Sequence, residues 1–494
     1  MTQRLLTAIL GCTVLASPCA AATAATPTVA ELQRQIDELK AMVQQLKAAQ
    51  EATARSAAAG PAPAPPAAAA PAPPMLATAP TAPKAPAGRA GPATVQQTAA
   101  AATAPVPSPK GKAWYERLTL RGYVQMRVNE IVSGDATAPP GQSRLRSVQD
   151  AGVTDLGNFS FRRIRLILQG DLGDNIGFYF QPDFGTVVNN QSANERRESY
   201  AQVRDAYIDV NFGKDREFKL RVGQSKVPYG WENLQSSSNR LALDRTDAIN
   251  SAVPGERDLG IVGYYTPVQV QRIWKRLGDD GQKLFGNYGV LALGVFNGQS
   301  INRTEANNDL MTVAMATWPI ELDGLGGALE GQVLEVGGSA MHNTFKPEIR
   351  TGGVSAATYD DERVGIHAIL YPQPFGLQAE WNWGRGPEYD QATKTIQTKS
   401  LNGGYIQTML RVKESPVGAF MPFARWQHYR GGWKAALNAP RLETDEFEFG
   451  VEFQPIRPLE LTLSYSHMKR LEADERRSGR AEGDVLRAQL QWNY

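Results

Sequence analysis

From Leu118 onward, apolar and polar residues alternate along much of the chain with a period of two. In the first such stretch, Leu118, Leu120 and Val124 share one face, and Arg121 and Arg127 share the other. Successive side chains of a β-strand point to opposite faces of the sheet, so this pattern predicts strands with one apolar and one polar face. Dividing the rest of the chain in the same way gives about sixteen strands. Clear further examples are residues 163–172, 205–212, 446–453 and 486–494.

Two architectures produce such strands. In a soluble sandwich the apolar face meets a protein core, whereas in an outer-membrane barrel it meets lipid and the polar face lines water. Arg and Glu stand in the middle of the polar faces, as at Arg163 and Glu448, where a soluble strand more often carries Thr or Ser. The runs also match the length that a tilted strand needs to cross a bilayer. These features favour the barrel.

The connections and the last residue support the same choice. Tight turns such as 173–175 and 213–215 alternate with longer polar segments such as 132–156 and 341–361, as expected when turns face the periplasm and loops face outside. Trp492 and Tyr494 share the lipid face of the final strand, and Tyr494 is the last residue. This resembles the terminal aromatic residue of bacterial outer-membrane barrels, in which Phe is more common than Tyr. The predicted fold is therefore all-β: a 16-stranded antiparallel transmembrane β-barrel over residues 113–494.

The residues before the barrel have a different character. Residues 1–22 resemble a secretory signal, with an apolar run too short to span a bilayer followed by small residues. Over residues 27–50, apolar residues at alternating spacings of three and four predict a short periplasmic coiled coil, or an amphipathic helix packed on the chain's own body. Residues 51–112 are rich in Ala and Pro and cannot bury a core, so we expect a disordered linker. The coiled-coil seam consists of Val29, Leu32, Ile36, Leu39, Val43 and Leu46.

Composition excludes several other classes of protein. The 494 residues carry 52 basic and 50 acidic side chains, a net charge of +2, so no basic field points to nucleic acid. Mean hydropathy is −0.36, and no near-continuous apolar run is long enough for a polytopic helical membrane protein. All 16 Phe, 9 Trp and 16 Tyr lie after residue 112, which places the folded body there.

Residues typical of catalysis or cofactor binding are scattered. Ser466 and His467 are adjacent, so they lie on opposite faces of a strand and out of hydrogen-bond reach. The four His have no metal-ligand spacing, and no Gly-rich phosphate loop precedes a helix. We therefore expect no enzyme activity, no cofactor and no metal site.

Several segments resemble the phosphate-selective porin O and P family. They are Phe161-Arg-Arg-Ile-Arg-Leu166, Asp205-Ala-Tyr-Ile-Asp209, the run from Leu220 to Gly230, its continuation through Glu232 to Gly260, and Gly294-Val-Phe-Asn-Gly298. The resemblance covers residues 115 to 494. It implies a homotrimer of 16-stranded barrels in the bacterial outer membrane, each with a loop that folds inward and narrows the pore.

Cationic side chains on the polar face are the candidates for an anion path. Guanidinium forks suit phosphate and carboxylate oxygens and stay charged at working pH. In the resembled family an arginine pair at this motif contributes to the anion path, and Arg162 and Arg163 match that pair. Strict alternation would turn Arg162 toward lipid. The candidates are Arg162, Arg163, Arg165, Lys219, Arg221 and Lys226. In the alternative, Arg162, Arg163 and Arg165 pair with Asp183, Asp205 or Asp209 across neighbouring strands and only stiffen the wall.

Residues 227–258 are too long and polar for a turn, and we expect them to form the constriction loop. Its cations are Arg240, Arg245 and Arg257. Phosphate-specific relatives carry a lysine-rich cluster at the constriction, and this loop has none. The sequence thus predicts a porin for passive diffusion of small hydrophilic solutes, with a preference for anions such as oxyanions. The alternative function is a structural link from the outer membrane to the cell wall through the coiled coil.

Overall fold

The computed structural model describes residues 114–135, 138, 140–145, 153, 157–185, 201–416 and 418–494. The predicted signal peptide, coiled coil and linker (1–22, 27–50 and 51–112) lie outside these residues. Within the described part of the chain, no helix is both long and apolar enough to cross a membrane.

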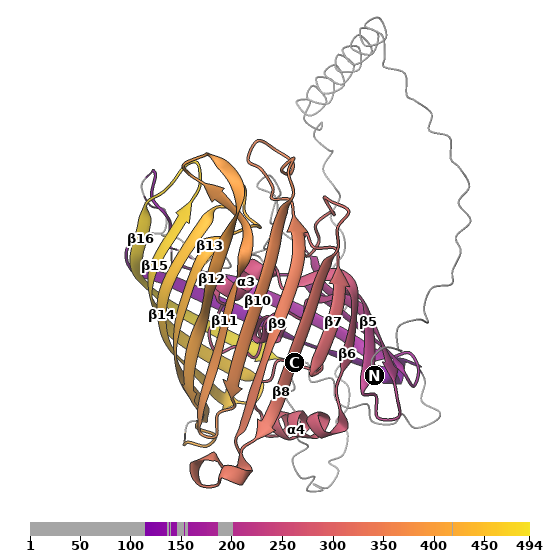
Figure 1. Ribbon diagram of the computed structural model, residues 1–494. Coiled ribbons are helices and arrows are strands. Elements are labelled where there is room, and N and C mark those ends of the chain that lie inside the picture. The colour runs from indigo at the N-terminus through magenta and orange to yellow at the C-terminus, as the bar shows by residue number, and fades with distance from the viewer. Residues whose placement is uncertain are drawn as a thin grey trace, which may run out of the picture. The chain divides into compact units, whose positions relative to one another are not determined.

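Sixteen antiparallel strands form one closed barrel, as the period-two pattern predicted (Figure 1). Each strand pairs with its neighbours in sequence, and β1 closes the ring against β16. The strands are β1 (Leu118–Ser133), β2 (Asn158–Asp171), β3 (Ile176–Asp183), β4 (Gln202–Phe212), β5 (Phe218–Lys226), β6 (Arg257–Tyr265), β7 (Leu291–Phe296), β8 (Met311–Glu321), β9 (Val333–Phe345), β10 (Tyr359–Leu370), β11 (Phe375–Asp390), β12 (Thr395–Leu410), β13 (Ala419–Gly432), β14 (Arg441–Ile456), β15 (Leu459–Ala473) and β16 (Arg480–Asn493).

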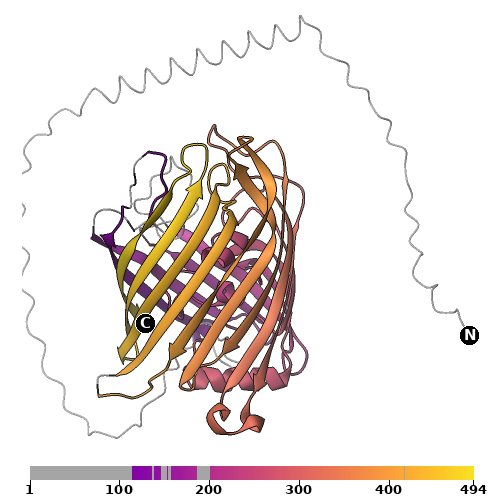
Figure 2. The same cartoon turned by 60° about the vertical axis from the view of Figure 1, so that its left-hand side comes forward.

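Among the described residues, helices occur only before β1 or in the connections between strands. The α-helices are α2 (Trp231–Leu234), α3 (Asp247–Ala252) and α4 (Val268–Asp279), and the 3-10 helices are η1 (Trp114–Arg117), η2 (Asp323–Leu325) and η3 (Gly327–Leu329). The antiparallel order places the connections 227–256 and 346–358 at one end of the barrel, here called the loop end. The turns 172–175 and 457–458 and the C-terminal residue lie at the opposite turn end, the lower end in Figure 2.

Apolar side chains lie on the outer face of the strands and charged side chains on the inner face, as the alternation predicts. On β14, Phe447 and Phe449 are half exposed on the outer wall, whereas Glu446 and Glu448 are buried inside. On β16, Leu486 faces outward and Arg487 inward. Such an arrangement suits a sheet that is surrounded by hydrocarbon and encloses polar groups.

Candidate pore constriction

A β-bulge in β2 turns an additional arginine into the lumen. The ladder between β1 and β2 pairs Gln125 with Arg163 and shifts before Phe161, so Arg162 has no opposite residue. A bulge leaves one residue unpaired and changes the direction of the side chains around it. Arg162 is consequently only 3% exposed and lies 3.5 Å from Asp244. Alternation alone pointed this side chain toward lipid, and the bulge reverses that direction.

A second bulge has the same effect in β4. The ladder between β3 and β4 pairs Gln181 with Asp205 and then shifts, which leaves Arg204 as the additional residue. Arg204 and Asp205 are both buried. Arg204 approaches Glu256 to 3.5 Å, and Asp205 accepts a 2.9 Å bond from Arg257.

Residues 227–256, which we call the inward loop, fold inside the barrel at the place where the constriction loop was predicted. All but Ser236, Ser238 and Asn239 are buried. The loop turns inward at Gly230, whose φ of +78° favours glycine; a Cβ there would lie 3.2 Å from Glu380 and from Ile249.

Asp244 fixes the inward loop to the strands where the barrel closes. It contacts Arg127 of β1 at 3.0 Å, Arg162 of β2 at 3.5 Å and Arg487 of β16 at 2.9 Å. Burial alone would raise the pKa of Asp244, but the three guanidinium charges outweigh it and hold the pKa well below its usual range.

Glu256 is the second anionic centre of the inward loop. Arg240 and Arg257 contact its two carboxylate oxygens, and Arg245 lies 3.2 Å away. Burial would raise the pKa of Glu256, whereas the charges of Lys226 and these arginines lower it well below its usual range. The carboxylate is therefore ionised and organises the cations around it.

The other side of the inward loop is tied to the wall of β11–β15. Glu380 of β11 accepts 2.6 Å hydrogen bonds from the backbone N–H groups of Trp231 and Glu232 at the start of α2. Glu232 itself lies 3.3 Å from Arg425, and Asp247 pairs with Arg470. The loop is thus held around much of the circumference, and it narrows the lumen.

The remaining predicted cations are also inside the barrel, and most have partners. Arg165 pairs with Asp183 at 2.8 Å, as the wall-stiffening alternative expected. Arg221 pairs with Asp209 at 2.7 Å. Arg163 donates a 2.7 Å bond to Gln125, and no ion pair to it occurs among the described residues.

The two lysines are bound differently. Lys219 donates to the carbonyl of Asn287 at 2.7 Å and lies 3.9 Å from Asp209. Lys226 donates to the carbonyls of Asn233, Leu234 and Gln235, at distances of 2.7–3.3 Å. These carbonyls belong to the last two residues of α2 and to the residue that follows it, so Lys226 stabilises the C-terminal end of that helix.

Charges of opposite sign lie on opposite sides of the lumen. On the side of β1–β6, β16 and the adjoining inward loop, cations outnumber carboxylates. The cations are Arg127, Arg162, Arg163, Arg165, Arg204, Lys219, Arg221, Lys226, Arg240, Arg245, Arg257 and Arg487, and the carboxylates are Asp183, Asp205, Asp209, Asp244, Glu256 and Asp258. The opposite side carries Glu380, Glu446, Glu448, Glu452 and Glu460 with fewer cations. We call these sides the basic wall and the acidic wall.

A second segment, residues 266–290, enters the lumen from the turn end; we call it the turn-end strap. The alternating pattern did not predict this segment. Its helix could have been predicted from the sequence, because Val270, Ile273, Trp274 and Leu277 recur at helical spacing; all four are buried in α4. The helix lies at the lower end of the barrel in Figures 1 and 2.

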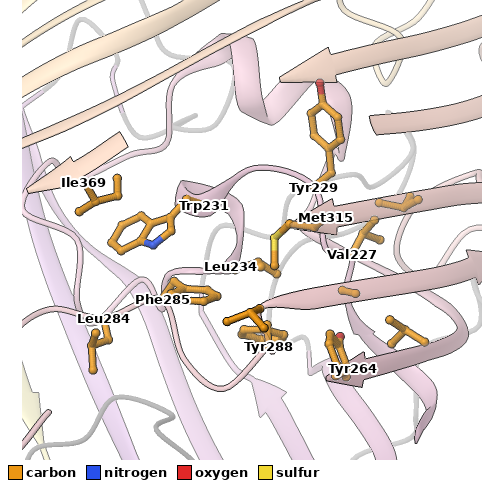
Figure 3. Close-up of a cluster of buried hydrophobic side chains, with 14 of the residues drawn as sticks. Val227, Tyr229, Trp231, Leu234, Tyr264, Leu284, Phe285, Tyr288, Met315 and Ile369 are labelled. Atoms are coloured by element: carbon orange, nitrogen blue, oxygen red, sulfur yellow. The ribbon is translucent and has the colours of Figure 1, made fainter. Parts of the chain in front are cut away.

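The strap and the inward loop meet in one aromatic cluster inside the barrel (Figure 3). Phe285 of the strap lies 5.8 Å from Trp231 of the inward loop and 5.2 Å from Trp274 of α4, measured between ring centroids. Tyr371 of the wall lies 6.5 Å from Trp231. Aromatic pairs at these separations contribute beyond their buried area.

Ion pairs also hold the strap to the far side of the barrel. Lys283 lies 2.8 Å from Glu452 and 3.5 Å from Glu460 on the acidic wall. Burial would lower the pKa of Lys283, but these carboxylates raise it above its usual value. Asp280 pairs with Arg411 at 2.7 Å and with Lys413 at 2.6 Å.

No group of three or more His, Cys, Asp or Glu side chains suited to a metal ion occurs in the part of the chain that the structure describes. The sequence agrees with a known family over most of its length: the model of the family described as phosphate-selective porin O and P matches residues 144–494. The chain belongs to this family. It is therefore a bacterial outer-membrane porin and not an enzyme, as its sequence indicated.

Solved structures of other porins resemble this porin at low sequence identity. The anion-selective porin from Comamonas acidovorans is 14% identical, with a TM-score of 0.46, and the match covers 76% of this chain and 99% of that one. OprB of Pseudomonas putida is 10% identical, with a TM-score of 0.46, covering 77% and 94%. OmpF of Salmonella typhi, in complex with daunomycin, is 12% identical, with a TM-score of 0.45, covering 76% and 97%. No curated protein matches the sequence.

Proposed function

We propose that this porin is a homotrimeric channel for passive diffusion of small hydrophilic solutes and that it prefers anions. The excess of cations on the basic wall is the observation that carries the anion preference. A charged group that lines a narrow pore acts on a passing ion through low-dielectric surroundings, where its effect exceeds that in bulk water.

Arg163 is the member of the basic wall that we assign most directly to the anion path. Its guanidinium is held by Gln125, a neutral partner, so its charge is not cancelled by a contact among the described residues. Arg162, Arg165, Lys219, Arg221, Lys226, Arg240, Arg245 and Arg257 contribute the field around it. Guanidinium groups match the oxygens of oxyanions such as phosphate. The ammonium of Lys226 already donates to backbone carbonyls, so we assign it only to the surrounding field.

Planar-bilayer recording in a salt gradient tests this proposal. The purified full-length porin should give stepwise conductance and a reversal potential of the sign expected for anion flow. A cation-selective reversal potential would overturn the anion preference. Absence of conductance steps, in a sample shown to be folded and inserted, would overturn the channel function.

Family resemblance supports the proposed trimer. One solved structure is described as the trimer form of Vibrio cholerae OmpT. For this chain the test is the mass of the detergent-solubilised protein. A mass of three chains supports the proposal, and a single-chain mass with full conductance contradicts it.

A structural role at the cell wall is the alternative function, and it is compatible with transport. It is favoured by the position of η1 and of the start of β1, where Leu118 pairs with Gly170 beside the turn end. Trp114, the first described residue, therefore lies on the side proposed to be periplasmic. Deleting residues 27–112 should weaken attachment of the envelope layers while the conductance of each channel persists. Unchanged attachment would remove this role.

A further inference from the structure

The outer wall of β13–β16 changes from apolar to charged toward the loop end. The sheet register places Ala424, Phe449, Tyr465 and Leu486 in one outward row. The next row holds Trp426, Phe447, His467 and Asp484, and the row after it holds His428, Asp445, Lys469 and Glu482. Closer to the loop end, the register aligns Arg430, Glu443, Leu471 and Arg480 in a single row across the four strands. These side chains point away from the lumen and are not part of the constriction.

Two arginines of this charged row share the carboxylate of Glu443 with Arg441, which lies closer to the loop end. Glu443, of which 15% of the side chain is exposed, pairs with Arg441 and Arg480, and Arg430 lies 3.8 Å from it. The side chains of Arg430 and Arg480 are 61% and 62% exposed. Glu443 cannot neutralise three guanidinium groups. Counted with the adjacent row, the four cations Arg430, Arg441, Lys469 and Arg480 face the three carboxylates Glu443, Asp445 and Glu482, so these two rows keep a small excess of positive charge that faces outward.

The arginines border a hollow on the outer wall. It has a volume of ≈ 430 Å³, and its lining includes Asn402, His428, Arg430, Asp445, Lys469 and Arg480. His428 stacks on Trp381 and Trp426, with ring centroids 6.2 Å and 6.1 Å apart. Aromatic side chains of this kind mark the interface between hydrocarbon and headgroups in membrane barrels. The hollow therefore lies at the level of the lipid headgroups.

We propose that this hollow binds the anionic, phosphate-bearing headgroup of an outer-leaflet lipid. Arg430 and Arg480 offer guanidinium forks that match phosphate oxygens. Lys469 also lines the hollow, where it pairs with Glu482 at 2.9 Å. Further toward the turn end, the outward row of Ala424, Phe449, Tyr465 and Leu486 provides the surface for the acyl chains of the same lipid. Clusters of basic residues beside the apolar belt recognise anionic headgroups in membrane proteins generally.

Native mass spectrometry of the detergent-solubilised full-length porin, titrated with phosphatidylglycerol, tests the proposal. The variant Arg430→Gln/Arg480→Gln should bind this lipid about thirtyfold more weakly, as expected when two cations are removed from an anionic lipid site. The control variant Lys275→Gln/Arg276→Gln removes two exposed charges from α4 at the turn end and should bind as the unchanged protein does. Phosphatidylcholine, whose headgroup is zwitterionic, should bind weakly to all three proteins.

Two results would overturn the proposal. One is equal phosphatidylglycerol binding by the Arg430→Gln/Arg480→Gln variant and the unchanged protein. The other is binding of inorganic phosphate that displaces the lipid at equal concentration, because the hollow would then recognise a free anion. Salt-gradient recordings should give the same reversal potential for all variants, which separates this site from the pore. If the double variant does not fold, Arg430→Gln alone should weaken lipid binding, and unchanged binding would again contradict the proposal.

Discussion

The ring centroids of Trp231 and Phe285 lie 5.8 Å apart, although the chain carries the two side chains into the barrel from opposite ends. Trp231 begins α2 in the inward loop, which enters from the loop end. Phe285 follows α4 in the turn-end strap. Both side chains are buried in the same cluster, so the two segments share one core and should loosen together.

Replacing Phe285 with Ala tests this coupling. Large-to-small substitution in a packed cluster costs about 3–5 kcal/mol, which should lower the thermal stability of the porin. Because the inward loop loses its support, single-channel conductance and its fluctuations should increase. Phe447→Ala, on the lipid-facing surface of β14, is the matched control and should change neither property. Unchanged conductance in Phe285→Ala would show that the two segments behave independently.

Asp244→Asn should release the inward loop from the strands at which the barrel closes. Removing one partner of a buried ion pair costs about 3–5 kcal/mol, and here Arg127, Arg162 and Arg487 all lose their shared carboxylate. We expect larger conductance and stronger anion selectivity in salt-gradient recordings. Asp215→Asn, in an exposed turn, removes the same charge as a control. A variant with the conductance and selectivity of the unchanged porin would contradict this assignment.

The docking of the inward loop should resist acid. Because the pKa of Asp244 is lowered in the folded porin, its stabilising contribution is fully present above the unfolded value of about 4 and is lost only as pH falls through the lower folded value. Conductance should therefore show no step attributable to this loop between pH 7 and about pH 4. A reversible rise in conductance near pH 6 would be inconsistent with this behaviour.

Lys283→Gln should open the turn end and favour cations. Without Lys283, Glu452 and Glu460 face the lumen without this partner, so cation permeability should rise. Since the folded pKa of Lys283 is raised, its contact is fully present below about pH 10.4 and is lost as pH rises through the higher folded value. Lys275→Gln, exposed on α4, controls for the loss of a charge. A reversal potential that stays constant in Lys283→Gln would leave the strap without influence on selectivity.

Arg163→Glu should reduce the anion preference of the channel. A unit charge about 4 Å from an ion changes its energy by about 1 kcal/mol even in water, so the anion-to-cation permeability ratio should fall about fivefold or more. The salt-gradient reversal potential reports this ratio. Arg385→Glu introduces the same charge change on the outer wall, where 52% of the Arg385 side chain is exposed, and should leave the ratio unaltered. If both variants give the same ratio as the unchanged porin, Arg163 is a wall residue.

The sequence predicted the barrel because alternation is a local property of each strand. Alternation also gives the lumen-facing positions of Glu446 and Arg487, since a closed sheet leaves only one face for charged side chains. Alternation misdirected Arg162, because a bulge depends on pairing with β1 and leaves no mark in the period of β2 alone. A bulge is defined by the register with the neighbouring strand, and the sequence of one strand alone does not contain that register.

The turn-end strap was missed for a different reason. A barrel leads one to expect short connections at the turn end, and residues 266–290 depart from that expectation. The helical spacing of Val270, Ile273, Trp274 and Leu277 was available in the sequence. The contacts of Lys283 with Glu452 and Glu460 were not predictable, because they join segments far apart in the chain.

Barrel closure and insertion of the inward loop are linked through Asp244. Arg127 and Arg487 come from the first and last strands, which pair only when the sheet closes, and both contact this one carboxylate. If the sheet closed without the loop, it would bring these two arginines together in the lumen without this shared counter-charge. During assembly, an already inserted loop thus favours pairing of β1 with β16, and that pairing in turn retains the loop. The pairing that closes the barrel is in this way coupled to the position of the loop inside it.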